Sequence, residues 1–380
     1  MTGPAYPAAR AVAAPLEAHF GRAFAAAQAD AAAGADPAPP PDAAAVEALV
    51  DAAFWASLRR EEGYAPRISL AYLPPERAEQ PLRFERRLPL APAALTRVAP
   101  AVERPGIHLG VWRDGDVLSV WGACRSIPPL SFVLEVVQPG LLVVKHRRRR
   151  DSGKFVNVAV LLGDQVRLVD EEGASLSDCP ALLAAMLGFD APASWAGSVN
   201  LLVDLAVSMR AHGRGGSLLV VPDGSRAWRE SIVEPMPYAV VPPFTRLADL
   251  MRGDSGERGP SWREALRRTV EGVAGLTAVD GATVMTEGYE LLGFGAKIGR
   301  REGGTPVDRV TLTEPTVGNA PAVLHPSQIG GTRHLSAAQF VHDQRDALAL
   351  VASQDGRFTV FAWSPCEEMV HAHRVETLLL

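Results

Sequence analysis

Apolar side chains follow a helical period near residue 50 and a period of two further along the chain. Behind Asp42, a candidate N-cap, they recur three or four residues apart until Gly63, which predicts one amphipathic helix. Between about residues 66 and 169, apolar and polar positions alternate between turn pairs such as Asp114-Gly115. We expect an antiparallel meander there, closed by a short helix over 181–187. The expected strands span 107–112, 117–121, 132–137, 141–145, 155–162 and 166–169.

The first 41 residues lack either period. Ala, Pro and Gly dominate them, and they end in the run Pro37-Ala38-Pro39-Pro40-Pro41. Because few large apolar side chains are available for burial, we interpret this segment as a flexible Ala/Pro-rich leader with a stiff polyproline end.

Helical and extended patterns alternate from about residue 198 onward, which favours an α/β domain. Helices are expected over 201–212, over 335–342, and behind a capping box made by Ser261 and Glu264. Strands are expected over 217–221, 289–294, 347–352 and 358–363, the last two joined by an Asp355-Gly356 turn. The expected organisation is a leader (1–41), a β-rich α+β domain (42–197) and an α/β domain (198–380).

Composition excludes several classes of protein. The 38 basic and 43 acidic side chains leave a net charge of −5, which argues against a nucleic-acid coat or a polybasic membrane binder. Cys124, Cys179 and Cys366 form no C-x-x-C pair, so neither a disulfide framework nor a thiolate metal site is expected.

No apolar run approaches the roughly 18 residues of a membrane span. The N-terminal residues also lack a hydrophobic signal core, because Glu17, His19 and Arg22 interrupt the alanines. We therefore expect a cytoplasmic protein without membrane or nucleic-acid partners.

The segment Asp280-Gly281-Ala282 places a carboxylate at the end of an apolar run, with two small residues behind it. Such a carboxylate suits Mg²⁺ or Mn²⁺, because both prefer oxygen ligands. An ordinary Asp-Gly β-turn is the alternative interpretation.

A second candidate segment begins with Gly330-Gly331 and continues into Thr332, Arg333 and His334 at the start of a predicted helix. The N–H groups and the positive end of a helix attract anions, and a guanidinium matches phosphate oxygens. A capped surface helix is the alternative.

In this order the two segments resemble the diadenylate cyclase (DAC, or DisA N-terminal-like) domain. Asp280-Gly281-Ala282 resembles its DGA motif, and Gly331-Thr332-Arg333-His334 resembles its G-T-R-H-R motif. Residues 215–222, 290–298 and 346–353 are similar to further strands of that domain, so the resemblance covers roughly 198–365. The β-rich region before it resembles the sensor domains that accompany some DAC-like proteins.

The resemblance implies a mixed β-sheet wrapped by helices, and a reaction that joins two ATP molecules into cyclic di-AMP and releases pyrophosphate. Two protomers, each holding one ATP, would meet face to face as a homo-oligomer. Asp280 would bind Mg²⁺ or Mn²⁺ and help to activate the 3′-hydroxyl. The residues expected around the phosphates and the adenine are Gly281, Ala282, Gly295, Ala296, Ile298, Gly331, Thr332, Arg333, His334 and Ser353.

The chain departs from the DAC pattern in three places. Leu335 replaces the second arginine, which removes a charge-assisted hydrogen bond worth about 1.5–3 kcal/mol unless another cation substitutes. The cations nearby in the sequence are Lys297, Arg300 and Arg301. Gln354 replaces an acidic residue, and the connection from Ile298 to Gly330 is longer than in that family. Three functions follow: a sensor-coupled diadenylate cyclase, a non-catalytic receptor for ATP or a cyclic dinucleotide, or an interaction scaffold with a vestigial pocket.

His371 and His373 alternate with alanine near the C-terminus and have the residue type of metal ligands. No carboxylate or thiol stands at a tested metal-site spacing from them. We therefore expect them on an exposed tail.

Overall fold

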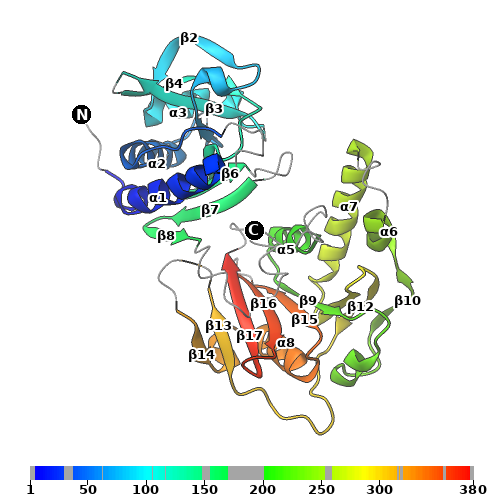
Figure 1. The fold of residues 1–380 in the computed structure, drawn as a ribbon. Helices are drawn as coiled ribbons and strands as arrows, with labels where there is room; N and C mark the ends of the chain where they lie inside the picture. Colours follow the sequence, from blue (N-terminus) through cyan, green and yellow to red (C-terminus); the bar gives the residue numbers. More distant parts are fainter. Residues whose placement is uncertain are drawn as a thin grey trace. The chain divides into compact units, whose positions relative to one another are not determined.

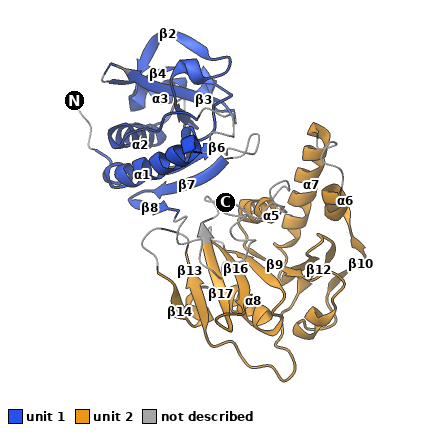
Figure 2. Ribbon diagram, viewed as in Figure 1, with its two compact units in different colours: residues 1–169, 379 blue, residues 170–378, 380 orange. Residues whose placement is uncertain are grey.

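The chain folds into two compact units, residues 1–169 (unit 1) and 170–378 (unit 2), which Figure 2 colours separately. The computed structural model describes residues 5–29, 37–61, 63–104, 106–115, 117–147, 155–169, 201–252, 259–314, 316, 320–353 and 357–376. The boundary expected at residue 198 and the helix expected over 181–187 lie outside these residues. No helix within the described ranges is long and apolar enough to cross a membrane.

The first helix, α1 (Pro7–Ala29), shows that the expectation of a flexible leader was wrong over these residues. Val12, Leu16 and Phe20 recur every four residues and are buried in the core of unit 1. The helix packs against α2 (Ala43–Ser57). Alanine has the highest helix propensity, and its small side chain lets two helices approach closely, so a few large apolar residues suffice to hold α1 in place.

The helix α2 begins where the sequence predicts. Asp42 is its N-cap and accepts a hydrogen bond from the backbone N–H of Ala45 at 2.8 Å. The helix ends at Ser57, ahead of the expected stop at Gly63.

Unit 1 is built on a mixed sheet whose order, within the described residues, is β2-β4-β3-β1-β5-β6-β7-β8. The expected antiparallel neighbours are found in the β3–β4 hairpin and from β5 to β8. The meander is broken between these two parts, because β1 lies between β3 and β5 and runs parallel to β3. The short strand β1 was missed because its mostly buried residues show no alternation. The strands are β1 (Ser69–Tyr72), β2 (Leu82–Pro89), β3 (His108–Asp114), β4 (Val117–Cys124), β5 (Phe132–Gln138), β6 (Leu141–Arg147), β7 (Phe155–Leu162) and β8 (Gln165–Leu168). A third helix, α3 (Pro92–Val98), packs against α2.

Unit 2 contains a second mixed sheet (Figure 1), ordered β10-β12-β11-β9-β15-β16-β17-β13-β14 within the described residues. β9 and β11 are parallel, as are β13 and β17, and the other pairs of neighbouring strands in this sheet are antiparallel. The strands are β9 (Gly216–Val221), β10 (Tyr238–Phe244), β11 (Ala282–Thr286), β12 (Leu291–Ala296), β13 (Val310–Thr313), β14 (Ala322–Leu324), β15 (Leu348–Ala352), β16 (Arg357–Ser364) and β17 (Met369–Glu376). The Asp355-Gly356 turn lies outside the described residues.

The helices of unit 2 are α5 (Leu201–Ala211), α6 (Arg246–Arg252), α7 (Pro260–Leu276) and α8 (Thr332–Asp343). α8 packs on β9, β15, β16 and β17, and its Phe340 joins Leu219 of β9 and Val351 of β15 in one apolar cluster. α5 packs against α7 and contacts β15.

The capping box expected at Ser261 and Glu264 does not form. The helix α7 starts two residues earlier, with Gly259 in place of Ser261 as its N-cap and Pro260 in its first turn. Ser261 is therefore already inside the helix, and Glu264 pairs instead with Arg267 and Arg268.

The expectation of an exposed tail at His371 and His373 was also wrong. Both lie on β17, which pairs with β16 on one side and β13 on the other. His371 is only 5% exposed and His373 only 1%, and their rings contact Glu367 and Thr313 respectively.

Candidate functional site

A pocket of about 590 Å³ lies in unit 2 where the start of α8 meets the ends of several strands. β9 contributes its first residues, and β12 and β15 contribute their last. The residues that line it are Ser217, Asp280, Gly281, Ala282, Ala296, Lys297, Ile298, Gly331, Thr332, Arg333, His334, Ser336, Val351, Ala352 and Ser353. Asp280 and Arg333, far apart in the sequence, thus face the same space.

All of the site residues expected from the sequence line this pocket except Gly295. Gly295 lies next to Gly281 of the pocket wall. A Cβ added to Gly281 would come within 2.5 Å of the carbonyl carbon of Gly295. Gly281 itself has a φ of +110°, a backbone conformation that residues other than glycine rarely adopt. The two glycines therefore let β11 and β12 approach closely enough to present Asp280 at the pocket.

Asp280 lies in the turn before β11, so the expectation that it ends an apolar strand was wrong: the strand follows the carboxylate. Its side chain is 90% exposed, and it forms an ion pair with Lys297. The pairing of Ala282 with Ala296 across β11 and β12 brings the next residue, Lys297, beside the carboxylate. The hydrogen bond and charge of Lys297, and the more distant charge of Arg333, hold the pKa of Asp280 below its ordinary value. The carboxylate is therefore ionised and able to bind a cation at neutral pH.

The start of α8 supplies donors for an anion. Its N-cap is Gly331, which has no side chain to accept from the N–H groups of the first turn. Thr332 and the half-buried Arg333 follow, and the positive end of the helix dipole lies at the pocket. A hydroxyl, a guanidinium and backbone donors can therefore surround phosphate oxygens.

His334 has a second role besides lining the pocket. Its Nε2 lies 3.4 Å from Thr359 Oγ1 of β16, and its ring meets Phe361 edge-on. Gly330 lies so close that an added Cβ would come within 2.3 Å of the His334 Nδ1. His334 therefore also anchors the glycine loop to the sheet.

Asp280 alone offers a divalent cation a weak site with one carboxylate, and a ligand that brings further oxygens would complete it. Within the described ranges, no group of three or more His, Cys, Asp or Glu side chains could hold a metal ion. Asp280 is the single carboxylate in the pocket wall. Mg²⁺ is commonly bound by one or two carboxylates plus substrate phosphates and water, so one aspartate beside a phosphate site matches that pattern.

Sequence reasoning assigned no role to Ser217 and Ser336 of the wall. Of the three cations considered as substitutes for the missing arginine, Lys297 lines the pocket and the other two, both arginines, do not. Ser336 stands one turn after Thr332, so the helical period could have found it. Ser217 and Lys297 depend on which strands become neighbours. Leu335, the residue that replaces the family's second arginine, is 37% exposed and does not line the pocket.

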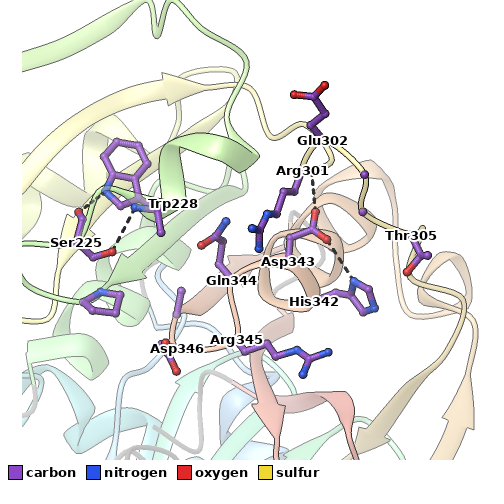
Figure 3. A pocket seen from close by; sticks show the side chains of 15 residues that line it. Ser225, Trp228, Arg301, Glu302, Thr305, His342, Asp343, Gln344, Arg345 and Asp346 are labelled. Atoms are coloured by element: carbon purple, nitrogen blue, oxygen red, sulfur yellow. Dashed lines mark hydrogen bonds and ion pairs between the residues drawn. The ribbon is translucent and has the colours of Figure 1, made fainter.

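A larger pocket, of about 680 Å³, lies at the opposite end of α8 (Figure 3). Asp343 in its wall has a side chain only 3% exposed and accepts hydrogen bonds from the Arg301 backbone N–H, Gln339 Nε2 and His342 Nδ1. Arg301 also pairs with Glu230. These charges are already engaged within the protein, and no predicted site residue is among them, so the smaller pocket is the better candidate.

Fold and site together define an α/β unit with a pocket lined by Asp280, Lys297 and Arg333, preceded in the chain by a second, β-rich unit. Residues 35–125 match the family described as "Probable sensor domain DACNV". This match identifies a probable sensor domain in unit 1 and does not extend into unit 2. No curated protein matches the chain.

Proposed function

We propose that unit 2 is a diadenylate cyclase-like nucleotidyltransferase that condenses two ATP molecules into cyclic di-AMP under the control of the sensor domain in unit 1. The observation that carries the proposal is that Asp280 and Arg333, taken from two separate motifs, line one pocket. The mixed sheet, the helix start at the pocket and the order of the motifs along the chain support it.

The chemistry of each residue in the pocket suggests its role in the reaction. Thr332, Arg333 and the first turn of α8 bind the triphosphate, with Ser353 at the facing strand end. Ala296 and Ile298 offer apolar surface to the adenine. Asp280 would hold Mg²⁺ or Mn²⁺, and this ion would supply charge neutralisation at the phosphates and favour ionisation of the attacking hydroxyl. Catalysis of this kind depends mostly on positioning and charge neutralisation.

The reaction requires two such pockets, each holding one ATP, to face one another. The 3′-hydroxyl of each ATP attacks the α-phosphate of the other, loses its proton, and breaks the bond to the β-phosphate. Two phosphodiester bonds form and two pyrophosphates leave. A homodimer that faces pocket to pocket is therefore part of the proposal.

One observation favours a second candidate, a receptor that binds ATP or a cyclic dinucleotide without turnover. The position of the second family arginine is Leu335, which lies outside the pocket wall. A missing cation weakens stabilisation of charge in the transition state more than it weakens binding to the remaining donors.

Incubation of the purified protein with ATP and Mn²⁺ or Mg²⁺, followed by chromatography, tests the proposal. We expect a cyclic dinucleotide from the wild type and a loss of about a hundredfold or more in Asp280→Asn. Asp308→Asn, which removes an exposed carboxylate outside both pockets, is the matched control and should retain activity. Both variants should melt like the wild type.

The assay also separates the candidates. ATP binding without any dinucleotide, at every protein concentration, would indicate the receptor. No shift in melting temperature with ATP would leave only a scaffold, because a ligand that binds the folded state must stabilise it.

A further inference from the structure

Lys297 is the cation of the candidate pocket to which no motif assigns a role. It follows the last residue of β12, and its Nζ forms an ion pair with Asp280 Oδ2. Two further cations follow closely in the sequence, but neither lines this pocket. Arg301 lines the second pocket and pairs with Glu230, and Arg300 lines neither pocket.

The charges in the pocket wall make Lys297 a competitor for a metal ion. Asp280 is the only carboxylate among the lining residues, and Lys297 already neutralises it. A divalent cation and the ammonium therefore require the same oxygens. An exposed ion pair is weak, so a divalent cation can displace the lysine at modest cost.

A displaced Lys297 has an obvious second partner. Its side chain is 52% exposed and belongs to a wall that also contains Thr332 and Arg333. Lysine carries its charge on a flexible stem with three rotatable donors, so it can turn from a carboxylate to a nearby phosphate. It would restore a cation that Leu335 does not provide.

We propose that Lys297 is a mobile counter-ion of Asp280, which competes with divalent cations for this carboxylate and contacts the phosphates of ATP once it is displaced. The phosphate contact rests on the proposed function, whereas the competition at Asp280 does not. The two parts predict effects of opposite sign when the lysine is removed.

The first experiment uses the full-length protein and Mn²⁺ alone, followed by water-proton relaxation, which detects weak binding. Lys297→Met should bind Mn²⁺ roughly two- to fivefold more tightly than the wild type, because a competing ion pair is lost. Arg300→Met removes the same charge outside the pocket and should have a smaller effect. In an Asp280→Asn background, Lys297→Met should make no difference.

Equal effects of Lys297→Met and Arg300→Met would overturn the competition at Asp280. So would the absence of Mn²⁺ binding to Lys297→Met, because the freed carboxylate is the proposed ligand.

The second experiment measures ATP binding at saturating Mg²⁺, where the cation occupies Asp280 and Lys297 is displaced. Lys297→Met should bind ATP about tenfold more weakly than the wild type, as expected for loss of a charge-assisted hydrogen bond. Lys297→Arg should retain most of the affinity, which a purely structural role of the residue would not predict. Unchanged ATP affinity in Lys297→Met would overturn the phosphate contact. If the wild type itself binds no ATP, the proposed function fails together with that contact, while the Mn²⁺ experiment still decides the competition.

Discussion

At the scale of single residues, Gly281 is the position where the conformation of the backbone most directly shapes the candidate site. A side chain there would require the unfavourable φ of +110° and would place its Cβ 2.5–2.9 Å from the backbone of Gly295 and Ala296. Neither the conformation nor the contact can relax through a flexible side chain, since the opposing atoms are main chain.

We therefore expect Gly281→Ala to lower the free energy of unfolding by about 1–3 kcal/mol and to weaken ATP binding as β11 and β12 separate. Gly272→Ala is a matched control within α7, where nothing lies within 4 Å of the added Cβ. It should stabilise the protein by up to about 1 kcal/mol, because alanine favours a helix. Urea unfolding and ATP titration of both variants provide the check, and equal stabilities would contradict this account of Gly281.

His373 is expected to make the stability of the fold, rather than the candidate site, depend on pH. Its Nδ1 lies 2.6 Å from Thr313 Oγ1, and its buried Nε2 has no partner within the described residues. Burial, and to a lesser extent His371, lower the pKa of His373 to about 3.

Since the unfolded chain takes up this proton near pH 6.5 and the folded chain only near pH 3, His373 makes stability fall as the pH drops through that interval. The slope is at most about 1.4 kcal/mol per pH unit for one histidine. His373→Leu should reduce the loss of unfolding free energy between pH 6.5 and pH 4.5, measured in urea. Identical losses in both proteins would show that this imidazole does not stay neutral in the fold.

At the scale of elements, α1 contributes to the core of unit 1 although its sequence is mostly small residues. Leu16 is fully buried, and Glu17 beside it is exposed. Packing of α1 on α2 thus depends on a few large side chains.

Leu16→Ala should lower the free energy of unfolding by about 2–5 kcal/mol, the range for a leucine removed from a packed core. Glu17→Ala should change it by no more than about 0.5 kcal/mol. Denaturant unfolding distinguishes the two. Equal values would mean that α1 adds little to the stability of unit 1.

The helix α8 connects local sequence with both pockets of unit 2. Its twelve residues span roughly 18 Å. The positive end of its dipole lies at the candidate site, and the negative end lies at the second pocket. The same helix therefore favours anions at one end only, which agrees with the placement of Thr332 and Arg333.

At the scale of the whole molecule, each unit has its own sheet and its own apolar core. The proposed reaction nevertheless needs two copies of unit 2, because one pocket holds one ATP. Cyclase activity per mole of protein should therefore rise with protein concentration until the dimer is saturated. Activity assays over a dilution series, with sedimentation at the same concentrations, provide the measurement. A constant specific activity across a range in which the protein dissociates would exclude a site shared between two copies.

Much of the local structure could be predicted because helices and strands impose their own side-chain period. The helix behind Asp42, the strands β5 to β7 and the helix α5 follow directly from that pattern. The errors about strand order and about His371 and His373 arise where residues far apart in the sequence become neighbours in the sheet. β1 inserts between β3 and β5, and β13 pairs with β17 at His371 and His373, and neither pairing leaves a trace in the local sequence.

By itself, the sequence determined which chemistry the chain carries: a carboxylate followed by glycine, and a cationic helix start behind a glycine pair. It could not determine that these segments share a pocket or that Lys297 lies on Asp280. Those facts follow from strand order and register, which depend on contacts between residues far apart in the chain. Side-chain period is a local property of the backbone, whereas the choice of a neighbouring strand is made by the packing of the whole sheet.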